Sequence, residues 1–203
     1  MNFSEIAEGV ENSNFLITTS IDKYILTLYE KRVDPNDLPF FLNLLTHLSS
    51  AGLSCPLPVE GIDGNALRTL GGRPAAIVTF LEGTWPRHSY THHCKALGSA
   101  MAMMHEFGQT FKQTRTNALT IPSWRPLLES CRLPEREIYI NLFNELNQEL
   151  NWLENNWPKN LPSGIIHADL FPDNEFFNQS DPVSYTHLRA HETRHDLVCR
   201  LLL

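Results

Sequence analysis

The stretch Ile165-Ile166-His167-Ala168-Asp169-Leu170-Phe171-Pro172-Asp173-Asn174-Glu175-Phe176-Phe177 decides how the rest of this chain is interpreted. Two apolar residues precede a His-x-Asp triplet, four residues separate Asp169 from Asn174, and two aromatic residues follow. This pattern predicts a short strand, a polar loop and a second strand. A carboxylate and a carboxamide at this spacing suit phosphoryl transfer, in which one group orients an attacking hydroxyl and the other holds a metal ion. The sequence therefore predicts Asp169 as a catalytic residue and Asn174 as a metal ligand, with a plain surface turn as the simpler alternative.

Composition limits the classes of protein to which this chain can belong. Its 203 residues are enough for one large domain or two small lobes, and its formal net charge of -7 argues against nucleic acid or an anionic membrane as a partner. No apolar run approaches the roughly 18 residues that a membrane-spanning helix needs. The N-terminus does not resemble a secretory signal, and the cysteines form no C-x-x-C pair. We therefore expect a cytoplasmic protein with reduced thiols at Cys55, Cys94, Cys131 and Cys199.

Residues 6–29 predict two or three strands with a polar loop between them. Phe15–Thr19 and Tyr24–Tyr29 are rich in β-branched and aromatic residues, which favour strands. The preceding segment, Glu8–Asn14, contains glycine and asparagine but no Walker A sequence. It predicts an ordinary hairpin turn or, alternatively, a loop whose main-chain N–H groups bind phosphates.

The next residues predict one helix and a pair of strands. Asp34-Pro35-Asn36-Asp37-Leu38-Pro39 is typical of a helix N-terminus, and apolar residues at helical spacing continue as far as Gly52. Residues 67–70 and 75–81 predict strands on either side of the Gly71-Gly72 turn. We therefore expect the first lobe to be a mainly antiparallel sheet with one helix.

Residues 82–86 interrupt these patterns and are expected to form a hinge between two lobes. After them, residues 91–107 and roughly 134–157 have the apolar spacing of helices. The intervening residues 116–126 predict an irregular loop, in which Arg125 is a candidate substrate-side residue.

The helix expected over residues 134–157 has apolar residues at near-heptad spacing. This spacing predicts a single apolar stripe along one side of the helix. We expect this stripe to pack in the protein core rather than to form a zipper with a partner; its members are Ile138, Leu142, Leu146, Leu150 and Leu153.

Taken together, the order of these elements and the His-x-Asp-(x)4-Asn motif resembles the kinase-like small-molecule phosphotransferases. That group includes aminoglycoside phosphotransferases, choline kinases and homoserine kinases, and the bacterial homoserine kinases are the most similar. The similarity extends from about Ile6 to about Phe177. The blocks that carry it are Ile6-Ala7-Glu8-Gly9-Val10-Glu11-Asn12-Ser13-Asn14-Phe15, Tyr24-Ile25-Leu26-Thr27-Leu28-Tyr29-Glu30-Lys31-Arg32, Asp37-Leu38-Pro39-Phe40-Phe41-Leu42, Arg73-Pro74-Ala75-Ala76-Ile77-Val78 and His167-Ala168-Asp169-Leu170-Phe171-Pro172-Asp173-Asn174.

This resemblance implies an α+β, protein-kinase-like fold of two lobes, with an antiparallel-sheet N-lobe and an incomplete helical C-lobe. It implies transfer of the γ-phosphoryl group of ATP to the hydroxyl of homoserine, giving O-phosphohomoserine on the route to threonine. Asp169 would deprotonate the hydroxyl and Asn174 would bind Mg²⁺. The residues implied to bind the nucleotide are Gly9, Val10, Glu11, Asn12, Ser13, Asn14, Val78, Phe80 and Leu81.

The sequence departs from the family pattern in the first lobe. Thr27 stands where related kinases place a strand lysine or arginine. Lys31 or Arg32 could supply the positive charge instead. Asp37 and Glu30 are the candidates for its acidic partner.

The C-terminal residues depart further from the family. A kinase of this fold needs a second metal-binding aspartate soon after Asn174, and the sequence has no convincing candidate. From about Val183 the sequence resembles translated sequencing adapter, so we expect the authentic protein sequence to stop near Asp181. We expect an N-lobe over residues 1–82, a partial C-lobe over 83–182 and a non-native tail over 183–203.

Two alternative functions and one misleading motif remain. The chain could belong to a kinase of another small hydroxyl compound, such as choline, an aminoglycoside or methylthioribose. It could also be a non-catalytic fragment that binds nucleotide. The four-residue spacing of His187, His191 and His195 imitates a metal site on a helix, but no carboxylate motif accompanies it.

Overall fold

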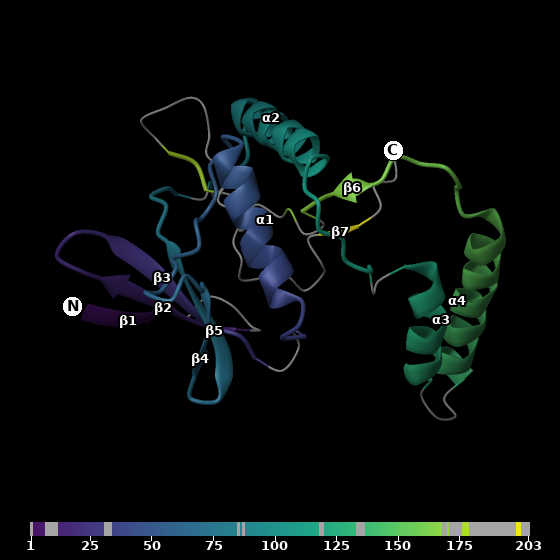
Figure 1. The fold of residues 1–203 in the computed structure, drawn as a ribbon. Coiled ribbons are helices and arrows are strands. Elements are labelled where there is room, and N and C mark those ends of the chain that lie inside the picture. The colour runs from purple at the N-terminus through teal and green to yellow at the C-terminus, as the bar shows by residue number, and fades with distance from the viewer. Residues whose placement is uncertain are drawn as a thin grey trace.

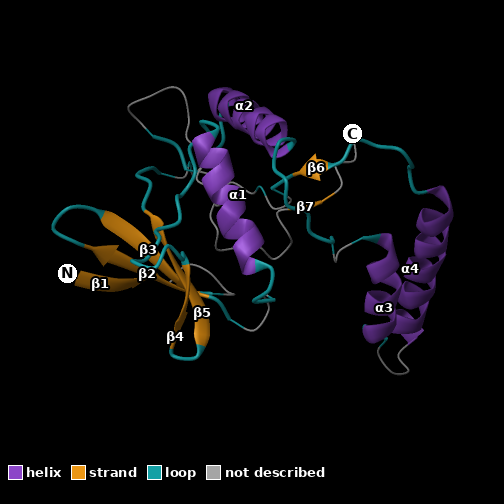
Figure 2. Ribbon diagram, viewed as in Figure 1, coloured by secondary structure: helices purple, strands orange, loops and turns teal. Residues whose placement is uncertain are grey.

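The computed structural model of this chain places a β-sheet beside four helices (Figure 1). The residues that it describes are 2–6, 12–30, 34–84, 86, 88–117, 120–132, 137–167, 170, 176–178 and 198–199. Within these ranges the architecture is α+β, as predicted, and Figure 2 shows the main sheet on one side of the molecule and a short pair of strands among the helices.

Five antiparallel strands form the main sheet. Their order is β1-β2-β3-β5-β4, so only β5 lies out of sequence order. Their bounds are Asn2–Ile6 (β1), Ser13–Thr18 (β2), Lys23–Leu28 (β3), Leu67–Leu70 (β4) and Arg73–Thr79 (β5). The sequence-based prediction of this sheet is confirmed, and β1 adds a strand that begins earlier than expected.

The glycine pair between β4 and β5 allows the tight turn that the sequence predicted. Gly71 and Gly72 have φ values of 59° and 79°, and two successive positive φ values suit the two-residue turns that match the twist of a hairpin. The main chain before β4 also joins the sheet, because Val59 N donates to Ile77 O at 2.8 Å. The far edge of β5 is therefore shared between β4 and this extended segment.

Helix α1, Leu38–Ser50, lies across one face of the sheet and joins it to the second lobe. Asp37 is its N-cap residue, Pro39 lies in its first turn, and Gly52 follows it with a φ of 103°. One side of α1, including Leu38 and Leu42, packs with Tyr29 and Ala76 of the sheet region. The other side packs in a second buried cluster: Phe40, Leu44, Leu45, Leu48, Leu53, Cys55, Met104 and Ile165.

Helix α2, Thr91–Gly108, follows the predicted hinge and packs against both α1 and the short strand β6, Gly164–Ile165. Its last residue, Gly108, lies so close to Ile165 that a Cβ there would be 3.0 Å from the Ile165 Cβ. Strand β6 pairs with β7, Val198–Cys199. The start of the motif-bearing segment is therefore held against α2.

Two predictions for the remainder of the second lobe are wrong. The expected irregular loop over residues 116–126 contains the start of a helix, α3, Ile121–Ser130. Thr120 is the N-cap residue of α3, and Pro122 lies in its first turn, a position where proline is tolerated. Helix α4, Glu137–Asn156, forms as expected, but its apolar stripe is not a core face. Leu150 is buried, whereas Leu142 and Leu146 are 51% and 47% exposed.

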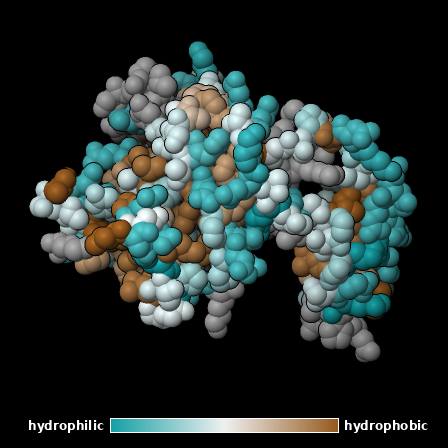
Figure 3. All heavy atoms as spheres, in the orientation of Figure 1, coloured by the Kyte–Doolittle hydropathy of each residue, from teal (hydrophilic) through white to brown (hydrophobic). Residues whose placement is uncertain are grey.

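Helices α3 and α4 pack on each other and stand apart from the sheet and from the α1–α2 pair (Figure 1). Hydrophobic residues, brown in Figure 3, are visible on this pair as well as on the main body. The large apolar and aromatic residues of the pair that are exposed to solvent are Leu127, Tyr139, Ile140, Leu142, Leu146 and Trp152. The pair lacks a second packing surface among the described residues.

Several predicted features lie outside the described residues, including the tail residues 183–197, which hold His187, His191 and His195. Among the residues that are described, no helix is long and apolar enough to cross a membrane. The same residues contain no group of three or more metal-binding side chains.

Candidate active site

The two ends of the motif-bearing segment are described, although its central residues are not. At the entry, Ile165 and His167 are buried, and His167 lines a small apolar pocket with Leu97, Met104 and Leu170. At the exit, Phe177 is buried and forms an antiparallel bridge with Thr84. The predicted catalytic Asp169 and metal ligand Asn174 lie outside the described residues.

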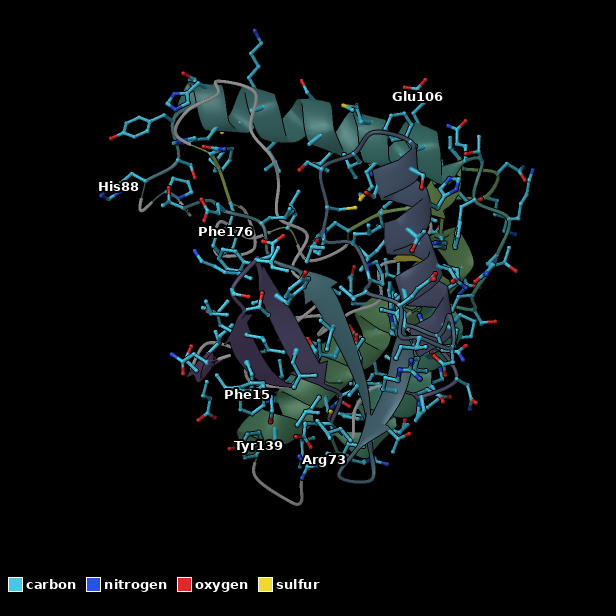
Figure 4. The ribbon with its side chains drawn as sticks, turned by 60° about the vertical axis from the view of Figure 1, so that its left-hand side comes forward. Phe15, Arg73, His88, Glu106, Tyr139 and Phe176 are labelled. Carbon is cyan, nitrogen blue, oxygen red and sulfur yellow. The ribbon has the colours of Figure 1, made fainter. Side chains whose placement is uncertain are left out.

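The bridge between Thr84 and Phe177 joins the hinge to the end of the motif. Thr84 N donates to Phe177 O, and Phe177 N donates to Thr84 O, both at 2.9 Å. Gly83 permits the close approach, because a Cβ there would lie 3.1 Å from the Phe176 Cβ. Figure 4 shows Phe176 beside the end of the sheet. Residues far apart in sequence are thus brought together where the two lobes meet.

The residues predicted to line the adenine slot lead directly into this hinge. Val78 is a buried residue of β5, and the half-buried Phe80 and Leu81 follow the strand. Phe80 N donates to Lys23 O at 3.2 Å, and the Lys23 ammonium lies 5.3 Å from the Phe80 ring centre. These three predicted residues therefore lie between the sheet and the Thr84–Phe177 bridge.

The predicted adenine-slot residue Val78 lies on the face of the sheet that α1 covers. The register aligns Leu16, Ile25 and Val78 in one row across β2, β3 and β5. Because strand side chains alternate between faces, Asn14, Thr27 and Ala76 form the next row on the same face. Ala76 packs against α1, so this is the face that α1 covers.

Thr27 and Asn14 place two buried polar side chains on this face of the sheet. Both side chains are 2% exposed, and they lie opposite each other on β3 and β2. The Asn14 Oδ1 atom has no hydrogen-bond partner among the described residues. This buried position holds a hydroxyl where related kinases are expected to carry a strand cation.

The other residues predicted to bind the nucleotide divide into two groups. Gly9, Val10 and Glu11 lie outside the described residues. Asn12 and Ser13 are described, and both bind Glu30: the Glu30 N–H donates to Asn12 Oδ1 at 3.1 Å, and Ser13 Oγ donates to Glu30 Oε1 at 3.1 Å. The Asn12 Oδ1 and Ser13 Oγ atoms are therefore committed to protein contacts.

Neither candidate acidic partner pairs with a lysine among the described contacts. Glu30 Oε1 accepts a bond from Arg73 Nη1 at 2.6 Å. Asp37 Oδ2 lies 2.6 Å from Arg115 Nη2, a residue of the segment after α2. Lys31 and Arg32 lie outside the described residues. The Asp37–Arg115 ion pair was not foreseen, and nothing in the local sequence indicates it.

Arg125, the predicted candidate for a substrate-side residue, contacts helix α4 in this structure. Its guanidinium donates to both carboxylate oxygens of Glu154, at 2.8 and 2.6 Å, and also to Asn147 and Asn151. All three partners lie on α4, so Arg125 joins α3 to α4. Hydrogen bonds from Arg125 are the main cause that holds the pKa of Glu154 below its ordinary value.

The sequence of this chain is similar to those of a known protein family. A family model described as "Phosphotransferase enzyme family" matches residues 2–185. The homoserine kinase of Paramagnetospirillum magneticum is 58% identical over 172 residues, which cover 85% of this chain and 53% of that protein. The homoserine kinase of Sinorhizobium fredii is 54% identical over 176 residues, covering 87% and 54%. The chain thus spans about half the length of these curated relatives.

Solved structures show the same fold at low identity. The amicoumacin kinase hAmiN, in complex with AMP-PNP, Ca²⁺ and Ami, has a TM-score of 0.68 at 19% identity and covers 88% of this chain and 56% of its own. A microcompartment-associated aminopropanol kinase has a TM-score of 0.68 at 20% identity, covering 92% and 63%. The predicted protein-kinase-like fold is therefore confirmed.

Proposed function

Because this chain belongs to the phosphotransferase enzyme family, we propose that it is part of an enzyme that phosphorylates homoserine. The reaction transfers the γ-phosphoryl group of ATP to the homoserine hydroxyl and gives O-phosphohomoserine, on the route to threonine. The identity of 58% to a homoserine kinase over 85% of this chain supports this substrate. The solved kinases of other small molecules are at most 20% identical among those compared above, so they support the fold and favour no other acceptor.

In this proposal the motif-bearing segment supplies the reacting groups. Asp169 accepts the proton of the homoserine hydroxyl and orients its oxygen toward the γ-phosphorus. Asn174 holds Mg²⁺, which neutralises charge on the phosphates when it is bound. The buried His167 and the Phe177 bridge hold the two ends of the segment, so both roles depend on a well-fixed loop.

The nucleotide is proposed to lie between the sheet and the motif. The row of Leu16, Ile25 and Val78 is apolar and suits the face of an adenine ring, and Phe80 and Leu81 continue toward the hinge. The loop residues Gly9 to Asn14 cover the phosphates in this arrangement. Support comes from the hinge bridge, which brings the end of β5 beside the end of the catalytic segment.

We also propose the division into lobes and the cellular compartment. The N-lobe comprises residues 1–82 and the partial C-lobe residues 83–182, while residues 183–203 form a non-native tail, of which Val198–Cys199 pair with β6. The family match, which ends at residue 185, supports the last boundary. A cytoplasmic location agrees with the free thiols of Cys55, Cys94 and Cys131.

The test is an ATP-turnover assay on two proteins. One is the 203-residue chain; the other joins residues 1–182 to the part of the Paramagnetospirillum relative that extends beyond the match. We expect homoserine-dependent ADP release from the second protein and little from the first, which spans about half of its relatives. Replacing Asp169 with Asn in the second protein should abolish turnover.

Control substrates separate the alternatives. Choline, an aminoglycoside and methylthioribose should give no turnover, and preferential phosphorylation of any of them would overturn the choice of homoserine. If nucleotide binds but neither of the two proteins turns it over, a non-catalytic binding module would be favoured. Strong homoserine-dependent turnover by the 203-residue chain would contradict the proposal that the chain alone is inactive.

A further inference from the structure

Glu30 joins three segments at one end of the sheet. It follows β3, it receives hydrogen bonds from Ser13 at the start of β2 and from Arg73 at the start of β5, and its own N–H donates to Asn12. The adjoining Tyr29 N donates to Pro74 O at 2.9 Å, which continues the β3–β5 pairing to this end. Arg73 is labelled at this end of the sheet in Figure 4.

The contacts of Glu30 are made on the side of the sheet away from the proposed nucleotide face. The register pairs Leu28 with Ala75, and two residues further along it brings Glu30 opposite Arg73. By strand alternation, Leu28 and Glu30 lie on the face opposite to Thr27, whose row is covered by α1. Any effect of Glu30 on a bound nucleotide must therefore pass through the chain segments that it holds.

The segments held by Glu30 include the end of the proposed phosphate-binding loop. Asn12 and Ser13 are the residues at which the chain enters β2 from residues 7–11. Asn12 is 8% exposed, so its bond to the Glu30 N–H is largely protected from water. Arg73 balances the negative charge of Glu30, which would otherwise repel phosphates nearby.

We propose that Glu30 is a positioning residue for the nucleotide phosphates. Its carboxylate fixes Ser13, the first residue of β2, where the proposed phosphate-binding loop ends, while the bond to Asn12 comes from its main-chain N–H and does not depend on the side chain. This proposal rests on the proposed function for its ligand, but the anchoring contacts themselves stand on the geometry alone. It also gives Glu30 a role other than pairing with a strand cation.

The experiment measures loop anchoring and nucleotide affinity separately in the full 203-residue chain. Amide hydrogen–deuterium exchange is followed in peptides that cover residues 7–14 and, for comparison, α1. Affinity is measured by titration with a fluorescent ATP analogue, mant-ATP, in the presence of Mg²⁺. The variants are Glu30→Ala and Glu30→Gln, and Asp63→Ala serves as a matched control because Asp63 pairs with Arg68 of β4 elsewhere on the sheet.

Glu30→Ala should accelerate exchange in the loop peptides by about fivefold, the effect expected for the loss of a hydrogen-bonded anchor, and weaken mant-ATP binding by a similar factor. Glu30→Gln keeps an acceptor for Ser13 and Arg73, so it should restore most of both properties. Asp63→Ala should change neither. Exchange in α1 should remain as in the parent chain.

Two results would overturn the proposal. One is unchanged loop exchange in Glu30→Ala, or an equal increase in α1, which would indicate general loosening. The other is faster loop exchange with unchanged mant-ATP affinity, which would show that the anchor does not position the phosphates. If the parent chain itself binds no mant-ATP, both the proposed nucleotide binding by this chain and the positioning role of Glu30 are overturned. The exchange data still decide whether Glu30 anchors the loop.

Discussion

Helix α1 and the α3–α4 pair both carry apolar stripes, but only α1 buries its stripe on two sides. Leu38 and Leu42 of α1 contact the sheet region, and Leu44 and Leu48 contact the cluster that contains Met104 and Ile165. By contrast, α3 has no buried residue, and Leu142 and Leu146 of α4 remain exposed. An apolar stripe at helical spacing therefore predicts a helix, but its burial depends on whether other elements supply a surface for it.

The polar contacts of α1 also reach other parts of the molecule, as its apolar contacts do, and those of the α3–α4 pair differ in this respect. At its N-terminus α1 is tied to the second lobe by the Asp37–Arg115 ion pair, and near its C-terminus His47 Nε2 lies 2.9 Å from Phe107 O. The Arg115 guanidinium also lies 5.3 Å from the Phe41 ring centre. Within the part of the chain that the structure describes, Arg125 connects α3 to α4. The α1 joint thus connects the two lobes, whereas the α3–α4 contacts are local.

Thiol labelling should show the largest contrast between the regions. Cys55 lies in the α1 cluster, where burial raises the pKa of its thiol to about 12, whereas Cys131 at the end of α3 is exposed. At pH 8 only about one Cys55 thiol in ten thousand would be ionised, so iodoacetamide should label Cys131 at least about a thousandfold faster. Peptide mass spectrometry would locate the label, and comparable rates would show that the α1 cluster opens readily.

Cavity-forming substitutions should give the next largest contrast. Leu48→Ala removes a side chain that is 1% exposed and should lower the free energy of unfolding by about 2–5 kcal/mol. Leu146→Ala, on the exposed side of α4, should change it by less than about 0.5 kcal/mol. Urea unfolding followed by circular dichroism measures both. Equal losses would mean that the α4 stripe is covered in solution, which would break the comparison.

Replacing Arg115, whose guanidinium pairs with Asp37 of the other lobe, should lower the free energy of unfolding by an intermediate amount. Arg115→Met leaves the Asp37 carboxylate, which is 28% exposed, without the guanidinium that pairs with it. Because water partly screens this pair, we expect a loss of about 1–3 kcal/mol rather than the larger cost of breaking a fully buried pair. Asp37→Asn in the same chain should recover part of the loss. A double variant no more stable than Arg115→Met would show that Arg115 acts through packing on Phe41.

The smallest effect should follow loss of the α3–α4 contact. Arg125→Ala should accelerate amide exchange in α3 while exchange in α1 stays unchanged. Because Arg125 lowers the folded-state pKa of Glu154, the stabilising effect is present above the unfolded-state pKa near 4.5 and is lost as pH falls through the lower folded value. The helicity of the parent chain and of Arg125→Ala should therefore differ at pH 7 and converge in acid. A difference that persists at low pH would contradict the ion-pair explanation.

The sequence predicted the local elements well because each is specified by neighbouring residues. The Gly71-Gly72 turn and the helix start at Asp37 follow from backbone preferences that operate within a few residues. Residues 121–126 were predicted incorrectly as part of an irregular loop, because Pro122 and Pro126 favour a loop over a helix. Pro122 lies in the first turn of α3, and Arg125 supplies a contact to α4 that no local pattern indicates.

The candidate site was only partly predictable, because some of its contacts join residues that are far apart in the sequence. The motif predicted which types of residue would carry the chemistry, and of the two strands expected beside the loop the first is β6, whereas Phe177 forms an isolated bridge with Thr84. The contacts of Ser13 and Asn12 with Glu30 could not be inferred, since they depend on the register of β2 against β3 and of β3 against β5.

The sequence by itself determined the family motif, the antiparallel sheet and the amphipathic helices, because these are encoded in residue type and spacing along the chain. The tertiary structure alone decided which apolar stripe is buried, which carboxylate meets which arginine, and how the hinge at Thr84 pairs with Phe177. Those outcomes require residues separated by tens of positions to lie within a few ångströms of each other. Their free energy comes from contacts that form only when whole elements pack together.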